Sequence, residues 1–171
     1  NNNGTIDSSP YELQTNRWHH VGITHSVSGE YKLYVDGVLI KSTSGGSPGE
    51  NTSRAILGAV DQTEYEIPTH YFNGWMEELR VWNVALTSDQ LREMMNQRIT
   101  QDGTSVSGEI LELKIDNLNW EDLIGYYRMD NIECSSIYPY NNGSDVGFSG
   151  KLRNITTPQQ RSAPLPYESD A

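Results

Sequence analysis

The segment 72–97 constrains the fold most, because within one stretch its pattern changes from that of a strand to that of a helix. From Phe72 to Asn83 large apolar residues alternate with charged ones, a period of two residues that predicts a β-strand. Because bulky residues occupy both of its faces, we expect a central strand of a layered sheet. Thr87 and Gln90 then form a capping-box pattern, which predicts that a helix begins there. The apolar side of this helix is expected to consist of Leu91, Met94 and Met95.

The chain before this segment has the pattern of strands joined by turns. Arg17–His25 alternates in polarity, and the residues from Tyr31 to Ile40 form two apolar runs separated by Asp36-Gly37. An Asp-Gly pair between apolar runs predicts a two-residue hairpin turn, because both turn positions require positive φ. Arg54–Val60 is mostly apolar, and we expect it to form a buried strand.

The chain after residue 97 has a less regular pattern. Residues 98–108 are polar and contain Gly and Ser, which predicts a linker. Further strands are expected at 109–115, at Leu123–Met129 and at Phe148–Ile155.

Composition restricts both the class of protein and its partners. The chain combines 35% hydrophobic residues with 4 Trp, 10 Tyr and 15 Gly, which favours an all-β domain over a disordered segment. Its net charge of −11 repels phosphate backbones and anionic lipids, so nucleic acid is not an expected partner. No apolar run reaches the roughly 18 residues of a membrane-spanning helix, and no membrane insertion is expected. The single cysteine, Cys134, has no partner for an internal disulfide.

Four blocks of sequence occur in an order that resembles the laminin-G-like family, which is concanavalin A-like and related to the pentraxins. They are Trp18–Thr24 (WHHVGIT), Tyr31–Gly37 (YKLYVDG), Ile56–Ala59 (ILGA) and Phe72–Thr87 (FNGWMEELRVWNVALT). The resemblance implies an all-β fold, a two-sheet antiparallel jelly-roll sandwich with one short helix. It also implies the calcium site that many members carry, and carbohydrate or protein ligands at the rim of the sheets.

The four blocks correspond only to the C-terminal half of such a domain. Leu123–Asp130 (LIGYYRMD) and Gly147–Asn154 (GFSGKLRN) resemble its opening strands. These later strands either begin a second, truncated copy or fold back to complete the first sandwich. We therefore divide the chain into the C-terminal part of a sandwich at 1–97, a linker with a candidate strand at 98–119, and opening strands with a Pro-rich tail at 120–171.

A half-sandwich exposes sheet edges, so a partner that supplies the missing strands is expected, either from the parent chain or from another chain. The chain opens on a loop-like stretch without an initiator Met, which we interpret as the interior of a longer polypeptide. The segments MMNQR and SAPLPYES resemble parts of large cell-surface adhesins of Bacteroidetes-type bacteria. That resemblance implies an extracellular or cell-surface location.

The same sandwich hosts glucanases, and a glycoside hydrolase needs a pair of catalytic carboxylates. A retaining enzyme needs its two carboxyl groups about 5–5.5 Å apart. Strand alternation predicts that Glu77 and Glu78 point to opposite faces, and Glu64 and Glu66 lie in a loop closed by Pro68. We therefore expect no catalytic residue.

Glu77 is predicted to point inward among apolar residues, where a carboxylate requires hydrogen bonds, a counter-charge or a metal. Two interpretations stay open. One is an ion pair or backbone hydrogen bonds at the sheet rim, and the other is a bound Ca²⁺, which takes six to eight oxygen ligands. The candidate calcium ligands are Glu77, Asp61, Glu64, Asp130 and Asp145.

Aromatic residues are candidates for stacking on sugar rings. Tyr65 and Tyr71 flank an acidic loop, and loops at the end of a sandwich carry recognition, so these two are the predicted ligand-binding residues. Trp18, Trp75 and Trp82 are expected to lie in the core.

Together these patterns predict an extracellular, non-catalytic binding module for a glycan or surface polymer. The alternatives are a structural spacer, an accessory domain left from a glycanase, and a glucanase-like enzyme on the same fold.

Overall fold

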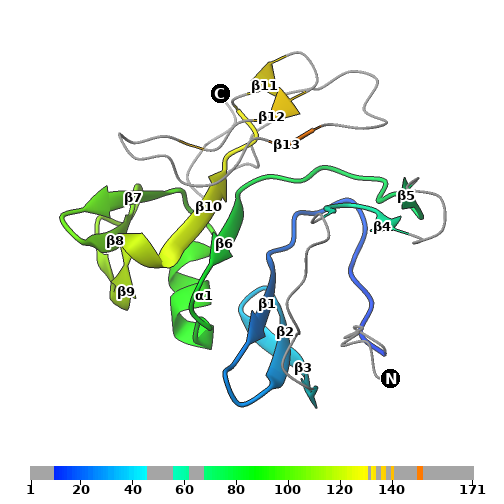
Figure 1. The fold of residues 1–171 in the computed structure, drawn as a ribbon, viewed down its shortest axis with the longest axis horizontal. Coiled ribbons are helices and arrows are strands. Elements are labelled where there is room, and N and C mark those ends of the chain that lie inside the picture. The colour runs from blue at the N-terminus through cyan, green and yellow to red at the C-terminus, as the bar shows by residue number, and fades with distance from the viewer. Residues whose placement is uncertain are drawn as a thin grey trace.

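The computed structural model describes residues 10–45, 56–61, 68–130, 132–133, 136–137, 140 and 150–151. Within these ranges the chain forms antiparallel strands, one α-helix and one 3₁₀ turn (Figure 1). None of the described helices is long and apolar enough to cross a membrane.

The strands of the described residues form five antiparallel sheets. The first sheet has the order β1-β2-β3 and consists of β1 (Val21–His25), β2 (Glu30–Val35) and β3 (Val38–Ser44). A second has the order β7-β8-β9 and consists of β7 (Ile99–Asp102), β8 (Ser105–Gly108) and β9 (Lys114–Asn119). Between them β6 (Leu79–Trp82) pairs with β10 (Leu123–Tyr127).

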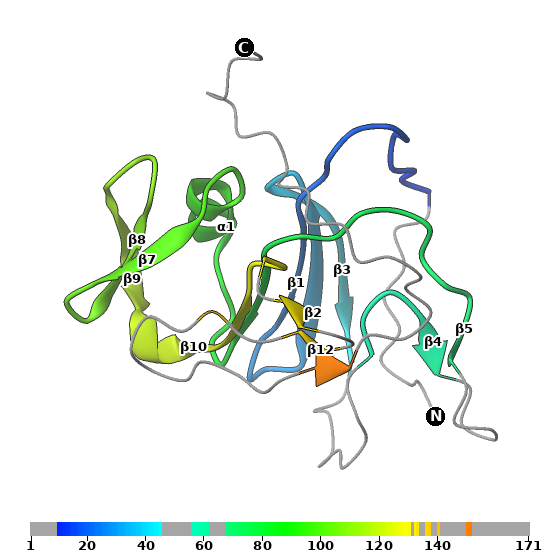
Figure 2. The same cartoon turned by 90° about the horizontal axis from the view of Figure 1, so that it is seen from above.

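Two short sheets complete the arrangement of the described strands. One pairs β4 (Val60–Asp61) with β5 (Pro68–Thr69). The other has the order β11-β12-β13, formed by β11 (Ile132–Glu133), β12 (Ser136–Ile137) and β13 (Gly150–Lys151). In both views the β7-β8-β9 sheet lies at one end of the molecule, and α1 and β10 lie between it and the β1-β2-β3 sheet (Figures 1 and 2).

The predicted hairpin is confirmed. Asp36 and Gly37 have φ of 50° and 73°, and Val35 pairs with Val38 across the two-residue turn. A Cβ atom at Gly37 would collide with the side chain of Arg92, so glycine is required there both by the turn and by the close approach of α1.

The predicted helix is also confirmed, as α1 (Ser88–Met94). The Gln90 backbone N–H donates to Thr87 Oγ1 at 3.2 Å, and the Thr87 N–H donates to Gln90 Oε1 at 2.9 Å, which is the reciprocal capping box. Leu91 and Met94 are buried, and Met95 is half-buried. The helix therefore buries the face that its sequence pattern predicts.

The long strand predicted at 72–83 is much shorter in the structure, because β6 begins only at Leu79. Glu78 has φ of 57°, a left-handed conformation that interrupts the pleat directly before Leu79. Among the described residues β6 pairs only with β10, so the prediction of a central strand is not confirmed.

Three other predictions of secondary structure need correction. Within the described part of Arg54–Val60, residues 57–59 form a bend and only Val60 belongs to a strand, because Gly58 has φ of 73°, and Leu57 is 55% exposed. The polar stretch 98–108 is not a linker but the β7-β8 hairpin, in which Ile99 and Val106 are fully buried. The strand expected at 109–115 begins only at Lys114, and in front of it the chain turns back between β8 and β9.

The strand predicted at Leu123–Met129 is present as β10, and it pairs with β6. Tyr126 pairs with Arg80 and Tyr127 with Leu79, which brings the 120–171 part against the 1–97 part. The division of the chain into domains and the expected partner segment stay predictions.

The core lies where α1, β2 and β10 meet the β7-β8-β9 sheet. Tyr126, Ile99 and Val106 have no exposed surface, and Met94 is 2% exposed. The core cluster comprises Tyr34, Leu86, Leu91, Met94, Ile99, Val106, Ile115, Leu118, Trp120, Leu123 and Tyr126, with Trp82 and Tyr140 packed against it.

Candidate functional site

An exposed aromatic segment runs between β5 and β6. The exposed fractions of Tyr71, Phe72 and Trp75 are 47%, 55% and 51%. We call these three side chains the aromatic surface. The expectation that Trp75 lies in the core is therefore wrong, and so is that for Trp18, which is 37% exposed. Trp82 does pack against the core, as expected.

The backbone of the aromatic segment is held by the bend at residues 57–59. The Phe72 N–H donates to the Gly58 carbonyl at 2.7 Å. Gly58 also lies so close to Met76 and Phe72 that a Cβ atom there would contact both side chains, and it has positive φ. This bend was expected to be part of a buried strand, and it instead supports an exposed surface.

Of the two predicted ligand-binding residues, Tyr71 belongs to the aromatic surface and Tyr65 lies outside the described residues. Their role in binding stays a prediction.

The predicted calcium ligands fall into two groups. Glu64 and Asp145 lie outside the described residues, and Asp61 is described only as part of β4. Glu77 Oε1 and Asp130 Oδ2 both lie 3.8 Å from the Arg98 guanidinium. A cation of the chain itself therefore stands between these two carboxylates, which do not fit a shared Ca²⁺ site. Within the described ranges, His, Cys, Asp and Glu side chains form no group of three or more that could hold a metal ion.

Glu77 and Glu78 do not point to opposite faces, contrary to the prediction. Arg98 Nη2 lies 3.8 Å from Glu77 Oε1, and Arg98 Nε lies 3.7 Å from Glu78 Oε1. The left-handed backbone at Glu78 removes the alternation on which the prediction depended, so both carboxylates turn toward one guanidinium.

Glu78 is part of a larger buried network. It accepts from Arg80 Nη2 and from the Tyr126 hydroxyl, each at 2.7 Å. Arg80 also donates to the carbonyls of Met94 and Gln97, at 2.9 and 2.6 Å. Burial, together with Glu78, raises the pKa of the Tyr126 hydroxyl to about 12, so this hydroxyl stays protonated and donates to Glu78 at neutral pH.

Arg128 extends the network toward β7. It bonds to Glu109 and donates to the Ile99 carbonyl at 3.2 Å, and its guanidinium carbon lies 3.5 Å from the centre of the Tyr140 ring. Burial lowers the pKa of the Arg128 guanidinium, but Tyr126 and Glu109 raise it more, so the net shift is upward. The network links β6, β7 and β10. Within it, Arg80 is paired with Glu78, and Arg128 is paired with Glu109.

Sequence reasoning missed this network. The available signal was an arginine in each of two strongly apolar stretches, at Arg80 and Arg128, because a charge among core residues needs a buried partner.

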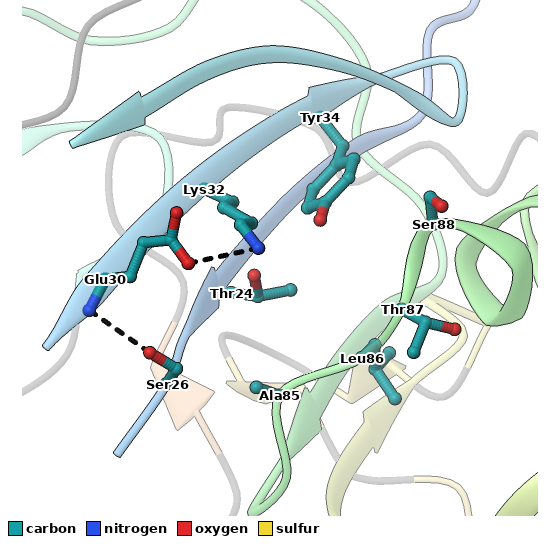
Figure 3. Close-up of a pocket in the computed structure, with 9 residues that line it drawn as sticks. All are labelled: Thr24, Ser26, Glu30, Lys32, Tyr34, Ala85, Leu86, Thr87 and Ser88. Carbon is teal, nitrogen blue, oxygen red and sulfur yellow. Dashed lines mark hydrogen bonds and ion pairs between the residues drawn. The ribbon is translucent and has the colours of Figure 1, made fainter. Parts of the chain in front are cut away.

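A pocket of about 320 Å³ lies between the β1-β2-β3 sheet and the segment that leads into α1 (Figure 3). It is lined by Thr24, Ser26, Glu30, Lys32, Tyr34, Ala85, Leu86, Thr87 and Ser88. We call it the Tyr34 pocket. The sequence patterns did not indicate it, because its two walls come from segments about 50 residues apart.

The sequence places this fold in a known group. The chain belongs to the concanavalin A-like lectin/glucanases superfamily, whose sequence profile matches residues 1–92. The all-β, antiparallel sandwich class with one short helix is thereby confirmed, together with the resemblance that predicted it.

Two relatives extend this assignment. The chain is 30% identical, over 83 residues, to the sushi, von Willebrand factor type A, EGF and pentraxin domain-containing protein 1 of Rattus norvegicus. The match covers 45% of this chain and 2% of the rat protein. A crystal structure of a candidate carbohydrate-binding protein from Bacteroides ovatus is similar, with 26% identity and a TM-score of 0.54. That match covers 83% of this chain and 38% of the Bacteroides chain, so this chain spans only part of each relative.

Proposed function

We propose that the chain is a non-catalytic module that binds a glycan or surface polymer through the aromatic surface, in an extracellular setting. The exposure of Tyr71, Phe72 and Trp75 within five residues of one another is the observation that carries the proposal. The similarity to a candidate carbohydrate-binding protein supports it.

Exposed rings of this kind offer flat apolar faces to a ligand. A sugar ring presents C–H groups on its faces and hydroxyls on its edges, so it stacks on aromatic side chains while its hydroxyls stay hydrated or bonded. Large apolar side chains that gather at a protein surface usually mark a contact site. The hydrogen bond from Phe72 to Gly58 holds the segment before binding, which lowers the entropy that binding costs.

The neighbouring carboxylates support a non-catalytic role. A glycosidase acid must reach the glycosidic oxygen, and its partner carboxylate must reach the sugar carbon. Glu77 and Glu78 instead contact the Arg98 guanidinium, and Glu78 also accepts from Arg80 and Tyr126. These contacts engage both carboxylates within the protein.

The proposal is tested on a glycan array that includes bacterial surface polysaccharides, followed by calorimetric titration of each positive glycan. We expect Tyr71→Ala and Trp75→Ala each to weaken binding at least about tenfold, equivalent to 1.4 kcal/mol. Tyr71→Phe should keep most of the affinity, because the ring is retained.

The control is Leu113→Ala, which removes a 68% exposed apolar side chain from the β8-β9 connection at the other end of the molecule. Wild-type affinity in both Tyr71→Ala and Trp75→Ala would exclude the aromatic surface as the site. Release of reducing sugar from a bound polysaccharide, lost in Glu77→Gln and Glu78→Gln, would favour the glucanase alternative.

A further inference from the structure

The Tyr34 pocket is separate from the aromatic surface and is built differently. Its floor is the face of β1 and β2 that carries Thr24, Lys32 and Tyr34, and its opposite wall is residues 85–88. In Figure 3 the Tyr34 hydroxyl and the Lys32 ammonium point toward the space between these two walls. A pocket of about 320 Å³ is at the lower end of the range for small-molecule sites.

Tyr34 is held firmly while its hydroxyl is left available. Tyr34 is only 5% exposed and belongs to the core cluster, so packing sets the position of its ring. Among the described residues the structure gives this hydroxyl no hydrogen-bond partner. A hydroxyl in a buried residue is normally bonded, so the pocket presents a donor and acceptor that water or a ligand must satisfy.

The charges of the pocket balance. Its lining contains one carboxylate, Glu30, and one ammonium, Lys32, which lie 3.1 Å apart. Glu30 is further held by Ser42, whose hydroxyl donates at 2.7 Å. A lining without net charge attracts neither anions nor cations, but it places a strong acceptor beside a strong donor.

The remaining lining combines hydroxyls with a small apolar wall. Thr24, Ser26 and Ser88 contribute hydroxyl groups, and Ala85 and Leu86 contribute apolar surface. Adjacent donors and acceptors facing an apolar wall match a molecule with neighbouring hydroxyls on one side and C–H groups on the other.

We propose that the Tyr34 pocket binds an uncharged sugar residue, with Tyr34, Lys32 and Glu30 bonding its hydroxyls and Leu86 packing on its C–H face. The module would then hold a glycan at two places, the aromatic surface and this pocket. The second site does not depend on the first.

The test is a titration of ¹⁵N-labelled protein with methyl glucoside, methyl galactoside and methyl mannoside, with glucuronate as the charged comparison. We expect at least one neutral glycoside to give saturable shifts at the amides of Thr24, Lys32 and Ser88. Tyr34→Phe and Lys32→Gln should each weaken that binding at least about tenfold, equivalent to 1.4 kcal/mol.

Two controls separate this site from other effects. Lys114→Gln removes an ion-paired lysine of the β7-β8-β9 sheet, and it should leave the affinity unchanged. Tyr71→Ala should weaken binding at the aromatic surface and leave the shifts around Thr24 intact. Because Lys32 is 36% exposed, Lys32→Gln should fold even if Tyr34→Phe loosens the core.

Absence of saturable shifts with all three neutral glycosides would overturn the proposal. Unchanged affinity in both Tyr34→Phe and Lys32→Gln would also overturn it. Binding of glucuronate alone would show that the pocket selects an anion, which contradicts the balanced charges from which the proposal is argued.

Discussion

Asp36 shows how much one turn residue can organise. Its carboxylate accepts from His19 Nδ1–H at 2.8 Å and from the His20 backbone N–H at 2.9 Å, and it lies 3.5 Å from Arg17. Burial raises the pKa of the Asp36 carboxyl, but the bonds from His19 and His20 and the charge of Arg17 outweigh it and lower the pKa below its ordinary value of 3.8. Asp36, which forms the β2-β3 turn, therefore also bonds that turn to the segment directly before β1.

We predict that Asp36→Asn lowers the free energy of unfolding by about 1 kcal/mol at pH 7, because the turn survives but the charge-assisted bonds weaken. The folded-state pKa lies below the unfolded one, so the contribution of Asp36 is present above about pH 4 and is lost as the pH falls through the folded pKa. Urea unfolding of both proteins from pH 7 to pH 2.5 measures this, and the two curves should converge at the acid end.

The control for that series is Asp102→Asn. Asp102 is 55% exposed and pairs with Lys114 at 3.3 Å, so its loss should change stability by less than about 0.5 kcal/mol. A difference between wild type and Asp36→Asn that stays constant down to pH 2.5 would rule out the carboxylate as its source.

At the scale of single elements, the starts of α1 and β6 are determined in different ways. The start of α1 is decided by Thr87 and Gln90, three residues apart, and sequence reasoning found it. The start of β6 is decided by the positive φ of Glu78, a non-glycine residue that no local signal marks. The network of Glu78 with Arg80 and Tyr126 stabilises that conformation, so the start of β6 depends on β10.

The cap of α1 leads to a second stability prediction. Thr87→Ala should lower the free energy of unfolding by about 1 kcal/mol, because the Gln90 N–H loses its acceptor. Urea unfolding measures the change. Thr87→Ser keeps the hydroxyl, so it should lower the free energy of unfolding by only about 0.3 kcal/mol. Equal losses in the two variants would indicate that the methyl group, rather than the cap, stabilises the helix.

At the scale of the whole molecule, calcium binding stays a prediction that stability can test. A bound ion stabilises the folded state by mass action, by about 2.7 kcal/mol when its concentration is 100 times its Kd. We expect the Tm to be higher in CaCl₂ than in EDTA. Because Glu77 is paired with Arg98, Glu77→Gln should leave that difference unchanged.

Magnesium at the same concentration controls for ionic strength and for nonspecific screening of the net charge of −11. A Tm that is the same in CaCl₂, MgCl₂ and EDTA would remove calcium from the description of this chain. A calcium response lost in Glu77→Gln would instead show that the ion displaces Arg98.

The sequence by itself determined the features that depend only on residues close together in the chain. The Asp36-Gly37 turn, the Thr87 cap and the order of the four family blocks are local patterns, and the structure and the family assignment confirm them. Each is decided within a few positions, where backbone preferences and short hydrogen bonds dominate.

Only the tertiary structure decided which distant groups meet. Residues 98–108 are mostly polar, which is why their sequence predicted a linker. Their two apolar residues, Ile99 and Val106, are nevertheless buried in the core cluster, together with residues of α1 and β10. Arg98 lies between Glu77 and Asp130, and Trp75 is exposed where a core residue was expected. The cost of burying a charge or a ring depends on what faces it, and those partners come from parts of the chain that no local pattern connects.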